Sequence, residues 1–259
     1  MVRWYSSKTR TAISKNNENN RADRRVSKYS MTYRIAFVQP NFQQGPKELG
    51  AYYLPYSAGV IWCYARQDAW VRENFQLTEW IWRREEVEPV VQRLAQNDVV
   101  AFSTYVWNHN YNYELARRVK EINPRVLTVF GGPEPAITDE DLFVKNPFMD
   151  VVICYEGEIT MQRVLRSFET QDWHNIPGLI YNVAGNAIKT KSAERITDLG
   201  EIPSPYLEGV FDQLIVDNPG ITWQGTLETS RGCPFMCTFC DWGSLTYNKV
   251  KKFELERVF

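Results

Sequence analysis

The 259-residue sequence lacks an excess of charge, a long apolar run and the cysteine spacing of a disulfide-rich fold. Its 30 basic and 31 acidic residues nearly cancel, so the whole chain shows no nucleic-acid-binding footprint. No apolar run approaches the roughly 20 residues that a helix needs to cross a bilayer. The five cysteines are an odd number, and three of them form a tight group that oxidation would destroy. We therefore expect a protein of the reducing cytoplasm that has no membrane and no nucleic-acid partner.

Two further absences concern the amino-terminal part of the chain. Residues 1–31 are rich in Arg, Lys, Ser and Asn, show no apolar periodicity and contain no hydrophobic segment of a secretory signal. We expect a disordered basic tail, or translation that starts at Met31, rather than a targeting sequence. The loop after the first expected strand, Gln39 to Gly45, contains no G-x-G-x-x-G, which argues against a dinucleotide site.

From Tyr33 to about residue 170, short apolar strands alternate with helices. The expected strands span residues 34–39, 75–80, 98–104, 125–130 and 150–154, and the expected helices span residues 55–66, 85–97, 111–122 and 159–169. Apolar strands that alternate with amphipathic helices predict a parallel sheet covered on both faces, so we assign a doubly wound α/β domain to residues 32–170. Ligand loops of such a domain lie at the carboxyl ends of the strands.

The chain changes in character after residue 170. Two short segments, 177–182 and 187–190, flank a Gly-Asn turn and predict a hairpin, which is followed by an extended connector with two prolines. We assign residues 171–220 to a linker, although the hairpin could equally be an appendage at the edge of the first domain. Residues 221–229 read as a strand that opens a second domain over residues 221–259, in which a helix begins near residue 252.

Directly after that strand stand Cys233, Cys237 and Cys240, spaced C-x3-C-x2-C. Thiolates so close together share one inorganic centre more plausibly than they pack a core. A structural zinc site needs four ligands, which here would require Cys63, Cys154 or a histidine as the fourth. A [4Fe-4S] cluster usually takes four cysteines, so three would leave one iron free for another ligand. Chance clustering of buried structural cysteines is the third alternative.

The spacing of these three cysteines, with the aromatic Phe239 before the last, resembles the signature of the radical S-adenosylmethionine (SAM) enzymes. The resemblance implies a [4Fe-4S] cluster whose open iron binds SAM and, once reduced by an electron donor of the flavodoxin or ferredoxin type, cleaves it to a 5′-deoxyadenosyl radical. It also implies that Phe239 lies near the adenine of SAM.

Further loops extend the resemblance over residues 33–259. Leu54-Pro55 follows the first expected strand, Gly131-Gly132-Pro133 the fourth and Glu156-Gly157-Glu158 the fifth, which is similar to the cobalamin-binding domain of B12-dependent radical SAM enzymes. The resemblance implies a flavodoxin-like sheet with cobalamin at its carboxyl edge, and methyl transfer to an unactivated carbon of a small-molecule, natural-product-like substrate; radical rearrangement, cyclisation or ring contraction is the second choice. The residues carried over as cobalamin-binding are Ser103, Thr104, Gly131, Gly132, Glu156 and Gly157.

One departure from related cobalamin proteins concerns the lower ligand of cobalt. Many cobalamin mutases and methyltransferases use D-x-H-x-x-G, whereas the loop from Gln39 to Gly45 contains no histidine. The usual position therefore supplies no imidazole. His109 lies near the end of a strand and could approach the ligand, although it is more readily understood as an ordinary loop residue, and His174 lies in the linker.

The second domain is expected to be the start of a TIM-type barrel, with its first strand, cluster loop and the beginning of a helix. Nineteen residues follow Cys240, so most of such a barrel would have to come from a longer chain or from a second chain. We expect this polypeptide alone to be inactive toward SAM. Two other function classes remain open: a non-catalytic cobalamin carrier or sensor, and a zinc-stabilised α/β binding protein.

Overall fold

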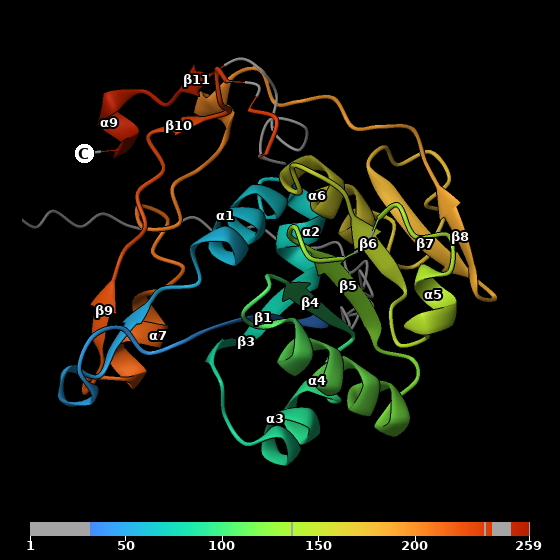
Figure 1. The fold of residues 1–259 in the computed structure, drawn as a ribbon, viewed down its shortest axis with the longest axis horizontal. Helices are drawn as coiled ribbons and strands as arrows, with labels where there is room; N and C mark the ends of the chain where they lie inside the picture. Colours follow the sequence, from blue (N-terminus) through green and yellow to red (C-terminus); the bar gives the residue numbers. More distant parts are fainter. Residues whose placement is uncertain (1–31, 136, 236, 240–249, 259) are drawn as a thin grey trace, which may run out of the picture. The chain divides into compact units, whose positions relative to one another are not determined.

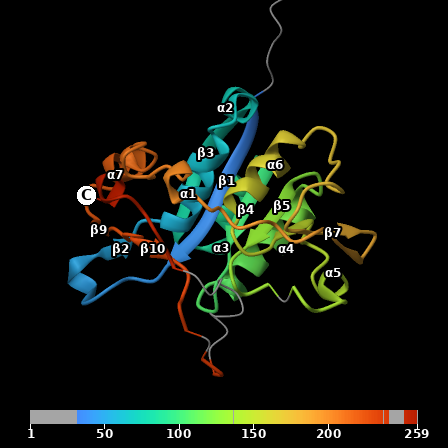
Figure 2. The same ribbon diagram turned by 90° about the horizontal axis from the view of Figure 1, so that it is seen from above.

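The computed structural model describes residues 32–258, apart from 136, 236 and 240–249. Its main feature is a seven-stranded sheet with the order β3-β1-β4-β5-β6-β7-β8 (Figure 1). Figure 2 shows β3, β1, β4 and β5 side by side in this order. The strands are β1 (Tyr33–Asn41), β3 (Phe75–Arg83), β4 (Val99–Ser103), β5 (Leu127–Gly131), β6 (Val151–Ile153), β7 (Leu179–Val183) and β8 (Asn186–Lys189).

The first five strands of the sheet, β3, β1, β4, β5 and β6, are parallel. Their order is the second, first, third, fourth and fifth along the chain, which is the flavodoxin-like arrangement. Each strand is apolar on both faces: in β1, Ile35 and Phe37 belong to one core cluster, and Ala36 and Val38 to the other. The doubly wound parallel sheet predicted from these apolar runs is confirmed.

Helices cover both faces of the sheet. Residues of α1, α2 and α6 pack into one core cluster, and residues of α3, α4 and α5 pack into the other. Figure 1 shows α1, α2 and α6 above the strands and α3 and α4 below them, with α5 at the right near β8. These helices are α1 (Tyr56–Ala65), α2 (Ala69–Asn74), α3 (Val87–Leu94), α4 (His109–Ile122), α5 (Leu142–Lys145) and α6 (Glu158–Arg166).

The hairpin expected in the linker is part of the sheet. Strand β7 pairs antiparallel with β6, and β8 pairs antiparallel with β7, so the hairpin forms the edge next to β6. Met149 O accepts a hydrogen bond from Asn182 Nδ2 at 3.2 Å and ties the hairpin to the segment before β6. The sheet therefore continues past residue 170, into the segment that was expected to hold the hairpin and linker.

The expected barrel strand over residues 221–229 is much shorter in the structure. Only β9 (Thr222–Gln224) forms there, and it pairs in parallel with β2 (Ala51–Tyr53) in a two-stranded sheet. A single parallel strand cannot satisfy its own backbone groups, so this one pairs with a loop of the first domain. The beginning of a TIM-type barrel is not confirmed in the described chain.

The remaining elements are η1 (Lys47–Leu49), η2 (Leu199–Glu201), α7 (Asp212–Asp217), β10 (Ser230–Arg231), β11 (Lys251–Lys252) and α9 (Leu255–Val258).

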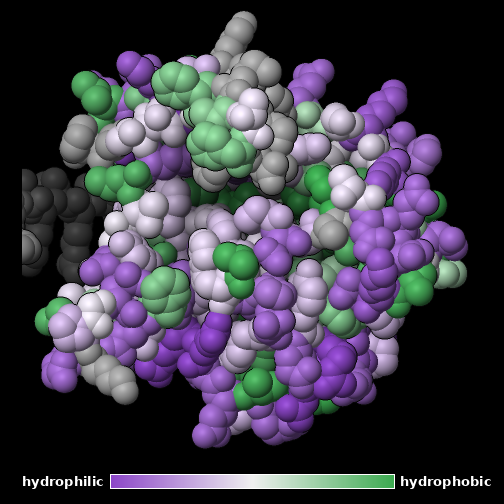
Figure 3. All heavy atoms as spheres, in the orientation of Figure 1, coloured by the Kyte–Doolittle hydropathy of each residue, from purple (hydrophilic) through white to green (hydrophobic). Residues whose placement is uncertain are grey.

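The face shown in Figure 3 is mostly hydrophilic where α3 and α4 lie. On α4, Arg117 pairs with Glu114 and Glu121, and all three side chains are exposed. Across the described residues, the helices are all too short or too polar to traverse a lipid bilayer.

Candidate cofactor site

The carboxyl ends of the parallel strands bring four of the predicted cobalamin residues together. Ser103 and Gly131 are register partners at the ends of β4 and β5. Directly beyond them, the backbone N–H of Thr104 donates to the carbonyl oxygen of Gly131 at 2.7 Å. Gly132 follows on the same edge, so these residues lie next to one another where parallel α/β sheets bind ligands.

The two glycines at this edge have different reasons to lack a side chain. Gly132 has a φ of +99°, and a Cβ there would lie 2.3 Å from the carbonyl oxygen of Thr104, so the turn requires glycine. A Cβ at Gly131 would meet no atom within 4 Å. The backbone at Gly131 is therefore open to an approaching ligand, whereas the backbone at Gly132 is closed by the protein itself.

Two buried asparagines form hydrogen bonds with the backbone at this edge, and neither was predicted from the sequence. Asn108 accepts from the Tyr105 N–H at 2.8 Å, and its Nδ2 donates to the carbonyl oxygen of Ser103 at 3.1 Å. Asn112, one turn later on α4, donates to the same oxygen at 3.2 Å. The amide oxygen of Asn112 is buried without a hydrogen-bond partner among the described residues. Their spacing of four residues directly after a strand was the available signal.

Large apolar side chains gather after the strands without being buried. Tyr105 and Trp107, after β4, stack with ring centroids 4.6 Å apart and an interplanar angle of 7°, and 42% of Trp107 is exposed. Tyr155, directly after Cys154 at the end of β6, is 51% exposed and has a φ of +62°. A left-handed backbone is uncommon for an aromatic residue and is often found where a structure serves a ligand. The carboxyl edge therefore carries exposed rings.

Glu156 and Gly157, also predicted to bind cobalamin, are engaged by the protein. The carboxylate of Glu156 accepts from the Ile196 N–H at 2.9 Å, and burial raises its pKa. A Cβ on Gly157 would lie 2.9 Å from Cδ1 of Ile61, so close packing against α1 accounts for this glycine. These two residues thus help to hold the loop after β6, and the Glu156 side chain does not stand free at the edge.

The cysteine segment is more open than the sheet edge. Cys233 is partly buried, Cys237 is exposed, and Phe239 is 90% exposed. Cys240 lies outside the described residues, so the convergence of the three sulfurs remains a prediction. Among the described residues, no cluster of three or more His, Cys, Asp and Glu side chains is arranged for a metal ion.

Cys63 and Cys154, the possible fourth ligands of a zinc site, are buried in the core. Burial raises the pKa of Cys63 to about 12 and that of Cys154 to about 11. Metals bind the thiolate, so protonated buried thiols are poor ligands. His109, at the start of α4, has its Nδ1 3.1 Å from the carbonyl oxygen of Val106, and His174 is exposed.

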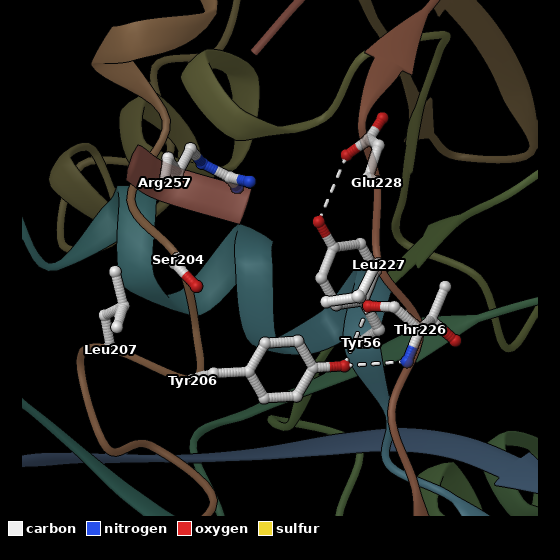
Figure 4. Close-up of a pocket in the computed structure, with 8 residues that line it drawn as sticks. All are labelled: Tyr56, Ser204, Tyr206, Leu207, Thr226, Leu227, Glu228 and Arg257. Carbon is white, nitrogen blue, oxygen red and sulfur yellow. Dashed lines mark hydrogen bonds between the residues drawn. The ribbon is translucent and has the colours of Figure 1, made fainter. Parts of the chain in front are cut away.

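A small cavity lies beside the segment that leads to the cysteines. Its volume is about 230 Å³, and Figure 4 shows the side chains around it. The rings of Tyr56 and Tyr206 stack at 5.8 Å, and the Tyr56 hydroxyl donates to Glu228 at 3.3 Å. Burial, followed by the nearby Glu228, raises the pKa of Tyr56 to about 12. The Tyr56 hydroxyl therefore stays protonated near pH 7 and acts as a hydrogen-bond donor. The lining residues are Tyr56, Ser204, Tyr206, Leu207, Thr226, Leu227, Glu228 and Arg257.

Comparisons with known proteins agree with this geometry. Residues 74–165 match the family described as the B12 binding domain. The cobalamin-dependent radical SAM methyltransferase TokK of Streptomyces tokunonensis is 35% identical over 210 residues, which are 80% of this chain and 31% of TokK. Over the matched regions the chain is homologous to cobalamin-dependent radical SAM methyltransferases. It spans about a third of the length of such relatives.

A second curated relative and two solved structures are also similar to this chain. The 2-(S-pantetheinyl)-carbapenam-3-carboxylate methyltransferase of Streptantibioticus cattleyicolor is also 35% identical over 80% of this chain, which is 31% of that enzyme. The structure of the radical enzyme OxsB with aqua-cobalamin and SAM bound shares the fold, with a TM-score of 0.63 at 19% identity over 87% of this chain and 30% of OxsB. The methyltransferase TsrM of Kitasatospora setae has a TM-score of 0.60 at 17% identity, over 88% of this chain and 44% of TsrM.

Proposed function

We propose that this chain supplies the cobalamin-binding part and the beginning of the cluster-binding part of a radical SAM methyltransferase that acts on a small molecule. The observation that carries the proposal is the open backbone at Gly131, on the edge where the B12-binding family match and the parallel strands coincide. The exposed rings of Trp107 and Tyr155 offer apolar contact to a flat macrocycle.

In this proposal the residues of the chain hold and orient the cofactors. Ser103, Thr104, Gly131 and Gly132 would line one side of cobalamin, while Glu156 and Gly157 would contribute through the backbone of their loop. Cys233, Cys237 and Cys240 would ligate a [4Fe-4S] cluster, with Phe239 beside the adenine of SAM. The bound cofactors supply the radical and the methyl-carrying cobalt, and an external flavodoxin- or ferredoxin-type protein supplies electrons. Transfer of the methyl group to an unactivated carbon is the proposed reaction.

A cobalamin titration tests the proposal at Gly131. We expect Gly131→Leu to raise the Kd for hydroxocobalamin at least about tenfold, because its side chain would fill the open edge. Gly131→Ala is the matched control, since a Cβ there meets no atom within 4 Å, and we expect near-normal binding. Equal affinities for wild type and Gly131→Leu, measured from the corrin absorbance, would place cobalamin elsewhere or exclude it.

The chain alone is proposed not to turn over SAM, because the rest of a barrel would come from a longer chain or from a second chain. Anaerobic reconstitution with iron, sulfide and SAM should yield no stoichiometric 5′-deoxyadenosine. Recovery of that product at one equivalent would refute this part of the proposal while supporting the cluster assignment.

A cobalamin carrier or sensor is the second candidate. It is favoured by the fact that the sheet and its carboxyl edge are complete in the described chain, whereas a barrel is not formed there. Elemental analysis after anaerobic purification separates the candidates. Cobalt with iron and sulfide supports the enzyme, cobalt without iron supports the carrier, and about one zinc per chain alone would support a zinc-stabilised binding protein.

A further inference from the structure

Five charged side chains meet between the loop after β6 and the cysteine segment, and we call this group the Arg231 cluster. Arg231 Nη2 lies 2.5 Å from Glu158 Oε1, and Arg231 Nε lies 2.6 Å from Glu228 Oε1. The Glu158 side chain is only 4% exposed and that of Arg231 only 15%. The members of the cluster are Glu156, Glu158, Arg195, Glu228 and Arg231.

The cluster joins parts of the chain that carry different proposed cofactors. Glu156 and Glu158 flank Gly157, at the carboxyl edge assigned to cobalamin. Arg231 stands two residues before Cys233. Each of its ion pairs therefore links the cysteine segment to the residues that follow β6 or to the residues that lead into the segment.

The backbone of Arg231 is held as well as its side chain. Arg231 pairs with Lys251 in the short ladder of β10 and β11, and its carbonyl oxygen accepts from Arg195 Nη2 at 2.8 Å. The ring of Phe253 lies 5.9 Å from the guanidinium carbon. Beyond this point the chain becomes exposed at Cys237 and Phe239. Arg231 is thus a strongly fixed residue directly before an open loop.

The charges explain why this contact is specific. Burial acts to lower the pKa of Arg231, but Glu158 and Glu228 outweigh it and raise that pKa. A buried arginine with two carboxylates uses its planar fork, which lysine cannot reproduce. Removal of one partner from such a buried group leaves the other charge uncompensated.

We propose that Arg231 is a positioning residue, which fixes the cysteine loop to the amino end of α6 and so sets where Cys233 lies relative to the cobalamin edge. The inference deepens the proposed function and rests on it for the role of the cysteines, but the anchoring itself can be measured without any cofactor. Cys233 is partly buried next to the anchor, whereas Cys237 is exposed farther along the same loop. The ratio of their reactivities therefore reports on the anchor.

The test is alkylation of the anaerobically purified, cofactor-free chain with iodoacetamide, followed by mass spectrometry of the Cys233 and Cys237 peptides. We expect Glu158→Gln and Arg231→Gln each to raise the Cys233-to-Cys237 rate ratio about fivefold. Arg231→Lys keeps the charge and loses the fork, so a smaller increase is expected. The double variant Glu158→Gln/Arg231→Gln should show a rate ratio similar to those of the single variants, because each of them breaks the ion pair between Arg231 and Glu158.

Arg117→Gln is the control, since it removes exposed ion pairs on α4. Urea unfolding of each variant shows whether an increased alkylation ratio comes from release of the loop or from loss of the fold. If Glu158→Gln does not fold, Arg231→Lys replaces it in the test. An unchanged ratio in folded Arg231→Lys and Arg231→Gln would overturn the proposal.

Iron and cobalamin are measured on the same proteins. If wild type binds both cofactors and Arg231→Gln holds less iron at unchanged cobalamin affinity, the positioning role is supported. If wild type binds neither cofactor, the proposed function fails, and the alkylation ratio still decides whether Arg231 anchors the loop.

Discussion

The carboxyl edge of the sheet and the cysteine segment are held by different means. At the edge, adjacent strands pair through Ser103 and Gly131, and buried Thr104 and Asn112 lie next to them. In the cysteine segment, two residues of β10 form the last regular structure before Cys233, and Phe239 stands almost fully in solvent. The edge is shaped before any cofactor arrives, whereas the cysteine loop depends on its anchor and on its ligands.

This difference has a consequence for the order of assembly. A preformed edge can bind cobalamin without losing conformational entropy in its loops. The affinity for cobalamin therefore depends on the shape of the backbone at this edge. A loop that is exposed over several residues gains order when a metal centre forms, because the centre replaces missing protein contacts. Substitutions at the edge should therefore act on folding or on cobalamin affinity, and substitutions at the cysteines should act on iron content.

The largest effect is expected at Gly132. Gly132→Ala forces a Cβ to within 2.3 Å of the Thr104 carbonyl oxygen in a left-handed backbone, and we expect a loss of about 3 kcal/mol in the free energy of unfolding. Urea denaturation of Gly132→Ala beside Gly131→Ala makes the measurement. Equal midpoints for the two variants would show that the edge is not preformed.

A smaller effect is expected from the pH dependence of Glu156. Its pKa is raised from 4.5 by burial, so the folded protein holds this proton more tightly than the unfolded chain. The contribution of Glu156 to the free energy of unfolding should be greatest at low pH and should fall as pH rises from about 4.5 through the raised pKa.

Glu156→Gln removes the titrating group and should flatten this part of the pH profile. The measurement is urea unfolding of wild type and Glu156→Gln between pH 4 and 7, with Glu169→Gln as an exposed control. A wild-type stability that rises relative to Glu156→Gln over this range would mean that the neighbouring arginines, rather than burial, dominate.

The smallest effect on the fold is expected at the cysteines. Cys237→Ser changes an exposed side chain, so the free energy of unfolding of the cofactor-free chain should change by less than about 0.5 kcal/mol. Iron content after reconstitution should nevertheless fall sharply. A large loss of stability without iron would contradict the view that this loop contributes little to the folded first domain.

The sequence predicted correctly those features that depend on the residue pattern within a single strand or helix. The run from Ile35 to Val38 is buried on both sides of β1, and such runs predicted the parallel sheet and the edge to which its ligand loops belong. The flavodoxin-like order and the similarity to B12-dependent radical SAM enzymes were implied by a resemblance in the loops after the strands and in the cysteine spacing.

Features that depend on distant contacts were missed. Nothing near Glu156 in the sequence shows that Ile196 would donate to its carboxylate, and nothing near Arg231 points to Glu158. The strand expected over residues 221–229 is only three residues long, and it pairs with the equally short β2. The sequence did not predict β2, so it gave no sign of this pairing. The short helices α2 and α5 have too few turns to display a clear apolar period.

The buried thiols of Cys63 and Cys154 offer a practical measure of whether the chain is folded. Cys63 and Cys154 are buried and protonated near neutral pH, so a thiol reagent applied to the native chain should leave them unmodified. Denaturant should then release two additional equivalents of thiol. A simple colour titration before and after unfolding would thus tell an experimenter, before any cofactor is added, whether a preparation is native.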